Sequence, residues 1–201
     1  MLQLLPITDK EKANTLRHLP TLAIDLGFSS KAKSCGLCFD QESEGKKEKF
    51  REAVQSTATW IKKVGECVLI LEAPLSGAFS SGNPDARGDF ERKDDHGKKS
   101  DRRWYVGAGG VMALAAIHFL RLLIAKAGKK AIKVHLLEGF ASRDKKPSDH
   151  ARVARDLYKA WCNSDPEIIG IEGETFSMLS LLRLKESANK CPAVLRLPDG
   201  R

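Results

Sequence analysis

Aromatic side chains are scarce in this chain, as are long hydrophobic runs. Phe, Trp and Tyr make up 6% of the 201 residues, so the stacking platforms that hold single-stranded nucleic acid are not abundant. The longest apolar run, Val111 to Ile124, is interrupted by His118 and Arg121 and is too short and too polar to span a bilayer. No fixed-period repeat and no low-complexity tract is present, so a repeat architecture is not expected.

Signals for export are missing as well. The N-terminal residues MLQLLPITDKEK contain no basic region before their brief apolar stretch, so neither a signal peptide nor a membrane partner is predicted. The five cysteines are an odd number spread over the chain. Without an export signal they indicate reduced thiols in a cytoplasmic protein.

The composition that is present is typical of a soluble globular protein. Hydrophobic residues make up 42% and charged residues 30%, which argues against a disordered chain. The length predicts one domain, residues 1–201, with enough sequence to bury a core. Lys and Arg exceed Asp and Glu by 34 to 26, a net charge of +8, which favours a polyanionic partner.

The hydrophobic pattern predicts an α/β fold. An arm or short helix over residues 1–20 precedes two strands that pair as a hairpin, and helices then alternate with strands. The expected elements are strands 22–28 and 34–39, helix 48–63, strand 67–71, a long polar loop 76–103, helix 109–126, strand 132–137, helix 148–162 with Ser148 as N-cap, and a C-terminal extension 163–201 containing strand 168–171, helix 175–187 and strand 193–197. A hairpin followed by βα units predicts a mixed sheet with helices on both faces.

Three acids occupy positions that favour a shared site. Asp25 lies inside an otherwise apolar strand, Glu72 ends a buried strand, and Asp149 is in the first turn of a helix. If the first and third strands are neighbours, Asp25 and Glu72 meet at one edge of the sheet. Asp149 and His150 extend the core stripe of their helix toward that sheet. Glu138, at the end of the next strand, is a further candidate for the cluster.

Such a cluster is chemically useful only with a cation. Clustered carboxylates repel, and a bound Mg²⁺ or Mn²⁺ relieves the conflict because hard cations take oxygen ligands. Two such ions, about 3.5–4 Å apart, activate a water and stabilise the leaving oxygen in phosphodiester cleavage. Each acid also has an ordinary structural interpretation. Asp25 can cap the turn at Gly27, Glu72 can pair with an arginine of the 76–103 loop, and Asp149 can stabilise its helix through the dipole.

Short motifs around these acids resemble a known superfamily. Asp25-Leu26-Gly27 followed by a glycine-containing second strand resembles the opening of the ribonuclease H-like superfamily. Glu72 at the end of a central strand, with an acid in the first turns of a late helix, is similar to its Holliday-junction resolvase branch. Glu72-Ala73-Pro74-Leu75 resembles the acid-Ala-Pro-Leu turn of a poorly characterised branch of predicted nucleases. The resemblance covers about residues 21–162.

The resemblance implies a ribonuclease H-like mixed sheet and a divalent-metal-dependent nuclease that hydrolyses DNA or RNA. Asp25 would bridge both metals and Glu72 would bind one of them. Asp149 would complete the site, with His150 or Asp156 as the alternatives for that place. The chain departs from the family pattern twice. The usual third hairpin strand is hard to find between residues 40 and 48, and the late helix has Asp-His where resolvase-type members more often place His ahead of Asp.

Positive charge is concentrated beside the predicted site. From Arg121 to Lys159 there are eleven Lys or Arg residues and four acids, a net charge of +7. A phosphate-binding rim is predicted from seven of these cations: Lys129, Lys130, Arg143, Lys145, Lys146, Arg152 and Arg155. Arg102 and Arg103 of the polar loop are expected to contact phosphates as well. The alternative is a solvated helix face with two basic loops.

Two other function classes fit the same features. The fold can serve as a non-catalytic nucleic-acid-binding module of a larger assembly, which would bind in a salt-sensitive, metal-independent manner. An opening Asp-x-Gly also occurs in the sugar-kinase and actin superfamily, but those proteins duplicate the fold and 201 residues hold only one copy. Resolvase-like members are often dimers, so a homodimer or a subunit of a larger complex is the expected assembly.

Three further signals are given structural roles. Cys35 and Cys38 have metal-ligand spacing, but residues three apart on a strand point to opposite faces. His118 lies in the apolar helix and His135 in a strand, and both are interpreted as core histidines with satisfied hydrogen bonds.

Overall fold

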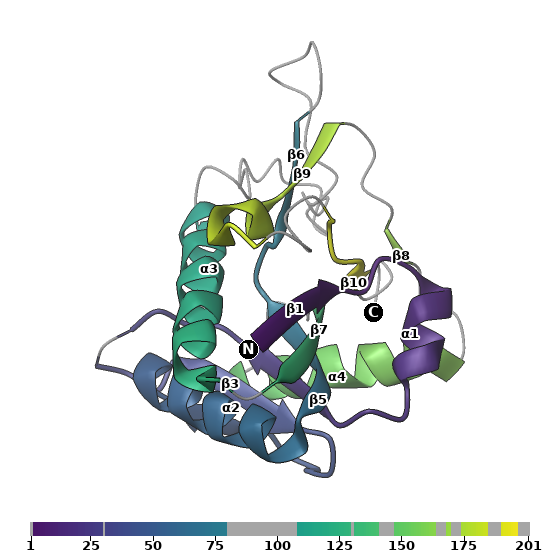
Figure 1. Ribbon diagram of the computed structural model, residues 1–201. Helices are drawn as coiled ribbons and strands as arrows, with labels where there is room; N and C mark the ends of the chain where they lie inside the picture. The colour runs from purple at the N-terminus through teal and green to yellow at the C-terminus, as the bar shows by residue number, and fades with distance from the viewer. Residues whose placement is uncertain are drawn as a thin grey trace, which may run out of the picture.

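The computed structural model describes residues 2–29, 31–79, 108–129, 131–140, 147–163, 168–169, 174–184 and 190–196. Its elements follow the order β1 (Leu2–Pro6), α1 (Lys10–Leu16), β2 (Thr21–Asp25), β3 (Cys35–Phe39), β4 (Lys46–Glu48), α2 (Phe50–Val64), β5 (Glu66–Glu72), β6 (Ser76–Phe79), α3 (Ala108–Ala127), β7 (Ile132–Phe140), α4 (Pro147–Asn163), β8 (Ile168–Ile169), β9 (Glu174–Ser177), the 3-10 helix η1 (Met178–Leu182) and β10 (Val194–Arg196) (Figure 1).

The principal sheet is mixed, as the sequence predicts. Its strand order is β4-β3-β2-β5-β7-β10-β8, and β1 also pairs with β7. The β2–β3 hairpin is antiparallel and β4 pairs antiparallel to β3, whereas β2, β5 and β7 are parallel neighbours. β1 and β10 share one side of β7, with β1 along residues 132–136 and β10 along residues 138–140. The carboxyl ends of β2 and β5 therefore lie side by side.

Helices cover both faces of this sheet, and strand residues alternate between the two layers (Figure 1). On β5, Leu69 and Leu71 pack in the core layer that contains residues of α2 and α3, whereas Val68 and Ile70 pack in the layer that contains α4. Each such side chain contributes roughly 1.5–3 kcal/mol on burial. The continuous apolar sequence of β5 is explained because both of its faces are covered.

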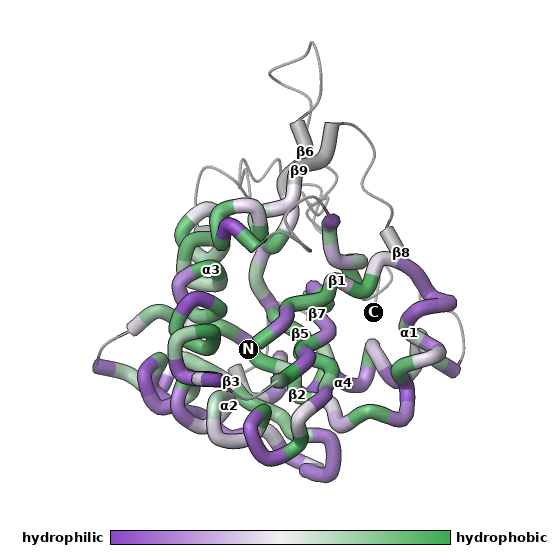
Figure 2. The backbone as a smooth tube through the Cα atoms, viewed as in Figure 1, coloured by the Kyte–Doolittle hydropathy of each residue, from purple (hydrophilic) through white to green (hydrophobic). Residues whose placement is uncertain are grey.

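Helix α3 is less buried than its apolar sequence predicts. Phe119, Leu120 and Leu123 are fully buried, but Val111 and Leu114 are exposed. Figure 2 shows hydrophobic colour along most of this helix. The segment Gly110–Ala127 is long and apolar enough to cross a membrane by length and composition, which corrects the expectation drawn from the shorter 111–124 run. Phe119, Leu120 and Leu123 pack in the core cluster that also contains residues of α2 and β5.

Long-range strand pairing accounts for three differences from the predicted elements. The short helix expected within residues 1–20 is α1, but residues 2–6 form an additional strand of the sheet, because Leu2 and Leu4 reach the core beside β7. The predicted polar loop begins instead with β6, which pairs with β9. The helix predicted over 175–187 is β9 followed by η1, whose first turn is capped by the Ser177 hydroxyl.

Two local differences matter for the site. The third hairpin strand, hard to find in the sequence, is the short β4 at Lys46–Glu48. Helix α4 begins at Pro147, so Ser148 is inside the helix and not its N-cap. Proline suits the first helical position because its missing N–H has no partner there anyway.

Candidate metal centre

The two strand carboxylates meet because their strands are in register. Asp25 and Glu72 are the last residues of β2 and β5 and are directly paired across these parallel strands. Ala23 and Ile70, two residues earlier on each strand, pack in the core layer that contains α4. Side chains repeat every two residues along a strand. Asp25 and Glu72 therefore point to the α4 side of the sheet.

Helix α4 supplies the third side chain from its first turn. His150 lies on the same stripe as Ala154, Leu157 and Trp161, all of which are buried against the sheet. The helix approaches closely because of Gly139 on β7. A Cβ atom at that position would lie 3.2 Å from the Cβ of Ala154 and 2.8 Å from Cγ2 of Ile70. This close packing places His150 over the ends of β2 and β5.

The loop between β3 and β4 holds the start and middle of α4. The Arg155 guanidinium donates to the carbonyl oxygens of Phe39, at 3.0 Å, and of Glu42. Lys159 Nζ donates to the Asp40 carbonyl at 3.2 Å and lies 2.8 Å from its carboxylate. A side chain at Gly45 would collide with the carbonyl oxygen of Ser148. The loop thus fixes the position of the helix turn that carries His150.

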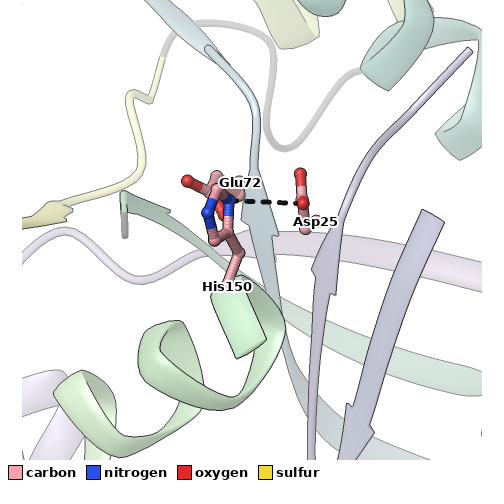
Figure 3. A group of neighbouring side chains, drawn as sticks. All are labelled: Asp25, Glu72 and His150. Carbon is pink, nitrogen blue, oxygen red and sulfur yellow. Dashed lines mark ion pairs between the residues drawn. The ribbon is translucent and has the colours of Figure 1, made fainter. Parts of the chain in front are cut away.

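The three side chains converge on one point (Figure 3). His150 Nδ1 lies 3.4 Å from Oδ2 of Asp25 and 3.3 Å from Oε2 of Glu72. These distances exceed the roughly 2.7–2.9 Å of a charge-assisted hydrogen bond. The side chains of Asp25 and His150 are each 16% exposed and that of Glu72 is 12% exposed. The imidazole therefore divides its interaction between two largely buried carboxylates.

Burial changes the acidity of the site. Desolvation raises the pKa of Asp25 from 3.8 to about 7, because a charged carboxylate loses hydration in this position. A group with such a pKa holds a proton that a cation can displace at neutral pH. Perturbed acids of this kind cluster at functional sites.

The three side chains form a group that could hold a metal ion. One atom each from Asp25, Glu72 and His150 lies within 4.8 Å of the others. Octahedral ligands about 2.1 Å from an ion are separated by about 3.0–4.2 Å, so a small contraction would let the three atoms take three of the six positions around an ion. Two carboxylate oxygens and one imidazole nitrogen suit Mn²⁺ better than Mg²⁺, which prefers oxygen. Among the described residues this is the one such group of three or more potential ligands.

Two predicted ligands are not members of this group. Asp149 is next to His150 in α4, but a helix turns about 100° per residue, and the stripe over the sheet is centred on His150 and Ala154. Asp156, the other alternative, is occupied by Arg152 and Arg155. The third member of the described group is therefore His150, one of the three alternatives predicted for that place.

Glu138 is a correction to the predicted site. It is not the end of its strand, because β7 continues to Phe140. It pairs with Leu71 across the strands, and so it points to the α2–α3 side, away from Asp25 and Glu72. There it is fully buried and accepts a hydrogen bond of 2.7 Å from Ser76 Oγ. Desolvation raises the pKa of Glu138 to about 8.

The predicted basic rim is only partly within the described residues. Lys129 is exposed just beyond α3, and Arg152 pairs with Asp156 at 3.5 Å within α4. Arg155 does not belong to a rim, because it is buried and engaged with the β3–β4 loop. Six other cations lie outside the described residues: Arg102, Arg103, Lys130, Arg143, Lys145 and Lys146. The arginines proposed as structural partners of Glu72 lie there too.

His135 and His118 differ in how far they match the prediction of core histidines with satisfied hydrogen bonds. His135 is buried, as predicted, and its Nε2 lies 2.9 Å from Oε1 of Glu66, but its buried Nδ1 has no hydrogen-bond partner among the described residues. His118 is not a core residue, because it is exposed on α3 and stacks on Phe50. The prediction was wrong because it rested on the apolar residues next to His118 in the sequence. Cys35 and Cys38 are free, buried thiols.

Comparison with known proteins gives no relative. No family model, no curated protein and no solved structure matches the chain.

Proposed function

We propose that the protein is a divalent-metal-dependent nuclease that hydrolyses phosphodiester bonds in DNA or RNA. One observation carries the proposal: Asp25, Glu72 and His150 come from two strand ends and a helix start and bring one ligand atom each within 4.8 Å of the others. Three unrelated segments are needed to build this group. All three side chains are polar, so packing of the apolar core does not explain why they lie together.

The topology supports the proposed ribonuclease H-like identity. The resemblance implies a hairpin of three strands followed by βα units, and β4 supplies the third strand. The two carboxylates end β2, the first strand of the hairpin, and β5, a central strand of the sheet, which agrees with what the resemblance implies. The second departure is the order Asp149-His150, where resolvase-type members more often place His ahead of Asp. It brings an imidazole to the site, which a cation that accepts nitrogen accommodates. We therefore favour Mn²⁺ over Mg²⁺ as the cofactor.

The residues would divide the work as follows. Asp25 and Glu72 hold the cation from the sheet and His150 from α4. A cation in this position supplies an activated water and stabilises the leaving oxygen in phosphodiester hydrolysis. Because Asp25 has a pKa raised to about 7, it exchanges its proton for the cation near neutral pH, so activity should increase between about pH 6 and 8.

A nucleic acid fits the rest of the molecule better than a small phosphoester. The chain carries a net charge of +8, and cations on a protein gain affinity by releasing counterions from a polyphosphate. The five cysteines are free thiols, which supports a protein that acts in the reducing cytoplasm. A homodimer or a subunit of a larger complex remains part of the proposal.

The decisive experiment compares the wild type with Asp25→Asn on mixed DNA and RNA substrates in Mn²⁺ and in Mg²⁺. We expect metal-dependent cleavage by the wild type and a loss of about 100-fold or more in the variant, beyond the ~10–100-fold cost of disturbing only a residue behind a ligand. Glu66→Gln, which removes a carboxylate at the other end of β5, is the matched control and should cleave normally. Equal rates for the wild type and Asp25→Asn would exclude the proposed site.

The same substrates also test the second function class, a non-catalytic nucleic-acid-binding module. A non-catalytic module would bind nucleic acid with a strong salt dependence, give no cleavage with either metal, and bind equally well in EDTA. That result would leave the fold and its charge as the only functional features.

A further inference from the structure

A second site lies on the opposite face of the sheet from the metal centre. The chain leaves β2 at Asp25 and reaches Phe28 three residues later. The Phe28 side chain is 60% exposed, although large apolar side chains gain by burial. Its ring meets Phe50 edge-to-face with 4.9 Å between centroids, and Phe50 in turn stacks on His118 at 5.8 Å with an interplanar angle of 4°. The three rings form one aromatic cluster with an exposed outer member.

This cluster lines a groove of about 920 Å³ between the start of α2 and the second half of α3. The volume is at the upper end of the ~300–1,000 Å³ typical of ligand sites. Three cations line the groove together with the rings: Lys49, Arg51 and Lys126.

The acid in the groove does not cancel this charge. Glu52, the one carboxylate among the lining residues, accepts a hydrogen bond of 3.0 Å from the backbone N–H of Lys49 and caps the helix. Lys126 Nζ donates to the neutral side chain of Gln55 at 2.9 Å and is not paired there with an acid. The lining residues therefore carry a net charge of +2, from three cations and one acid.

The groove and the metal centre open at the same edge of the sheet. β3 runs antiparallel to β2, and β4 antiparallel to β3, so β4 ends where β2 ends. Helix α2 begins two residues after β4, and its start is therefore at the edge that carries Asp25. Phe28 can be no more than about 11 Å from Asp25 along the chain. One polynucleotide can reach both sites.

We propose that this groove binds an unpaired segment of nucleic acid, with a base against Phe28 and the backbone phosphates against Lys49, Arg51 and Lys126. A nucleotide offers a planar apolar ring and an anion within one unit, and the groove offers the complement of each. A paired base would not expose its face to Phe28. An acidic peptide would satisfy the cations but not the exposed ring. The inference deepens the proposed function, since it names a substrate with unpaired nucleotides beside the cleaved bond.

The test measures binding without cleavage. Fluorescence anisotropy in EDTA compares a labelled 12-nucleotide single strand with the duplex of the same sequence. We expect the wild type to prefer the single strand. Phe28→Ala should weaken that binding about tenfold, and Phe28→Trp should restore it, because each stacked base is worth roughly 1–3 kcal/mol. Since Phe28 is largely exposed, both variants should fold, which circular dichroism checks.

Charge variants test the phosphate contacts separately. Arg51→Ala should reduce the slope of log affinity against log salt by about 0.7, the value for one phosphate contact on a single strand. Lys63→Ala is the matched control, because Lys63 is an exposed cation in the last turn of the same helix, about 18 Å away at 1.5 Å per residue. It should leave the slope unchanged.

Two outcomes would overturn the inference. One is single-strand affinity that is unaffected by Phe28→Ala. The other is displacement of the oligonucleotide by an acidic peptide such as polyaspartate at equal concentration, which would make the groove a peptide site. Neither depends on metal. Phe28-dependent binding without cleavage by the wild type would uphold the groove and reject the nuclease proposal, and cleavage that is insensitive to Phe28→Ala would do the reverse.

Discussion

Strand β5 carries a glutamate at each end, and each contacts a histidine. At its first residue, Glu66 pairs with His135 at 2.9 Å. At its last residue, Glu72 shares His150 with Asp25, at 3.3 and 3.4 Å. Glu66 is 40% exposed and its pKa is lowered by the hydrogen bond from His135. Asp25 is largely buried and its pKa is raised to about 7.

The difference between the two ends shows what separates a structural pair from a candidate ligand set. One acid with one histidine, in contact with water, needs nothing more. Two acids with one histidine, removed from water, can carry a second negative charge only at the cost of desolvation, and Asp25 therefore retains a proton up to about pH 7. A divalent cation can replace that proton at the carboxyl end of β5.

Metal affinity should show the largest difference between the two ends of β5. His150→Ala is expected to lower Mn²⁺ affinity by more than tenfold, because one of three protein ligands is lost. His150→Asp should recover Mg²⁺ binding at the expense of Mn²⁺, since an all-oxygen set suits the harder ion. Isothermal titration calorimetry measures both. Glu66→Gln should bind like the wild type, and a loss of affinity in that variant would break the comparison.

Bound metal should stabilise the fold through the carboxyl end of β5 only. At a concentration 100 times its dissociation constant, Mn²⁺ should add about 2.7 kcal/mol to the free energy of unfolding, or several degrees in Tm. We expect this shift in the wild type and in Glu66→Gln. At the same Mn²⁺ concentration the shift should fall to about 1.4 kcal/mol or less in His150→Ala, whose affinity is more than tenfold weaker. Differential scanning fluorimetry measures it, and an equal shift in all three proteins would indicate metal bound elsewhere.

The pH dependence of stability should have opposite signs at the two ends. The folded protein keeps a proton on Asp25 that the unfolded chain releases between about pH 4 and 7, so metal-free stability falls as the pH rises through that window. Asp25→Asn removes this loss and should be about 1–3 kcal/mol more stable than the wild type at pH 8, with no difference near pH 4. Urea unfolding in EDTA at several pH values measures the difference.

Glu66 provides the contrast in the same measurement. Because its pKa is lowered in the folded protein, its contribution is present above the ordinary glutamate pKa and is lost as the pH falls. Glu66→Gln should therefore be less stable than the wild type at pH 7, by under about 1 kcal/mol for so exposed a pair. If Glu66→Gln were more stable than the wild type at pH 7, Glu66 and His135 would not be a stabilising pair.

The smallest effect is expected from the acid on the other face. Glu138 has a pKa raised to about 8 and is mainly protonated at pH 7, so Glu138→Gln should change metal affinity and cleavage less than about twofold. Metal-free stability of the wild type falls as the pH rises between about 4.5 and 8, because the unfolded chain releases this proton before the folded protein does, so at pH 8 and above the variant should be the more stable protein. Reduced metal affinity in Glu138→Gln would place it in the metal centre after all.

Much of the architecture follows from sequence, because it depends on local periodicity. The β2–β3 hairpin, the apolar β5 and helices α2, α3 and α4 lie within a few residues of their predicted positions. β1 and β9 were missed, since each becomes a strand only by pairing with a partner more than 90 residues away. Such pairing overrides local preference and leaves little trace in a single sequence.

Only the part of the site that depends on the direction of the strands could be predicted from the sequence. Asp25 and Glu72 are in place because parallel neighbours bring their ends together. Glu138 was misassigned since the sequence does not show that β7 continues to Phe140 or which residue pairs with Leu71, and one residue of register reverses the face. The choice between Asp149 and His150 turns on one helical step, which only the packing of Ala154 against Gly139 determines.

The contact of the β3–β4 turn with Ser148 and Arg155 of α4 has an evolutionary consequence. Surface turns are ordinarily where natural variation adds or removes residues with little harm. Here an insertion between residues 40 and 45 would displace the carbonyl groups that hold Arg155 and push on the Ser148 carbonyl. The imidazole two residues further on would then be moved away from its acids. Descendants of this sequence that keep the metal centre should therefore keep the length of this short turn, even where its amino acids diverge.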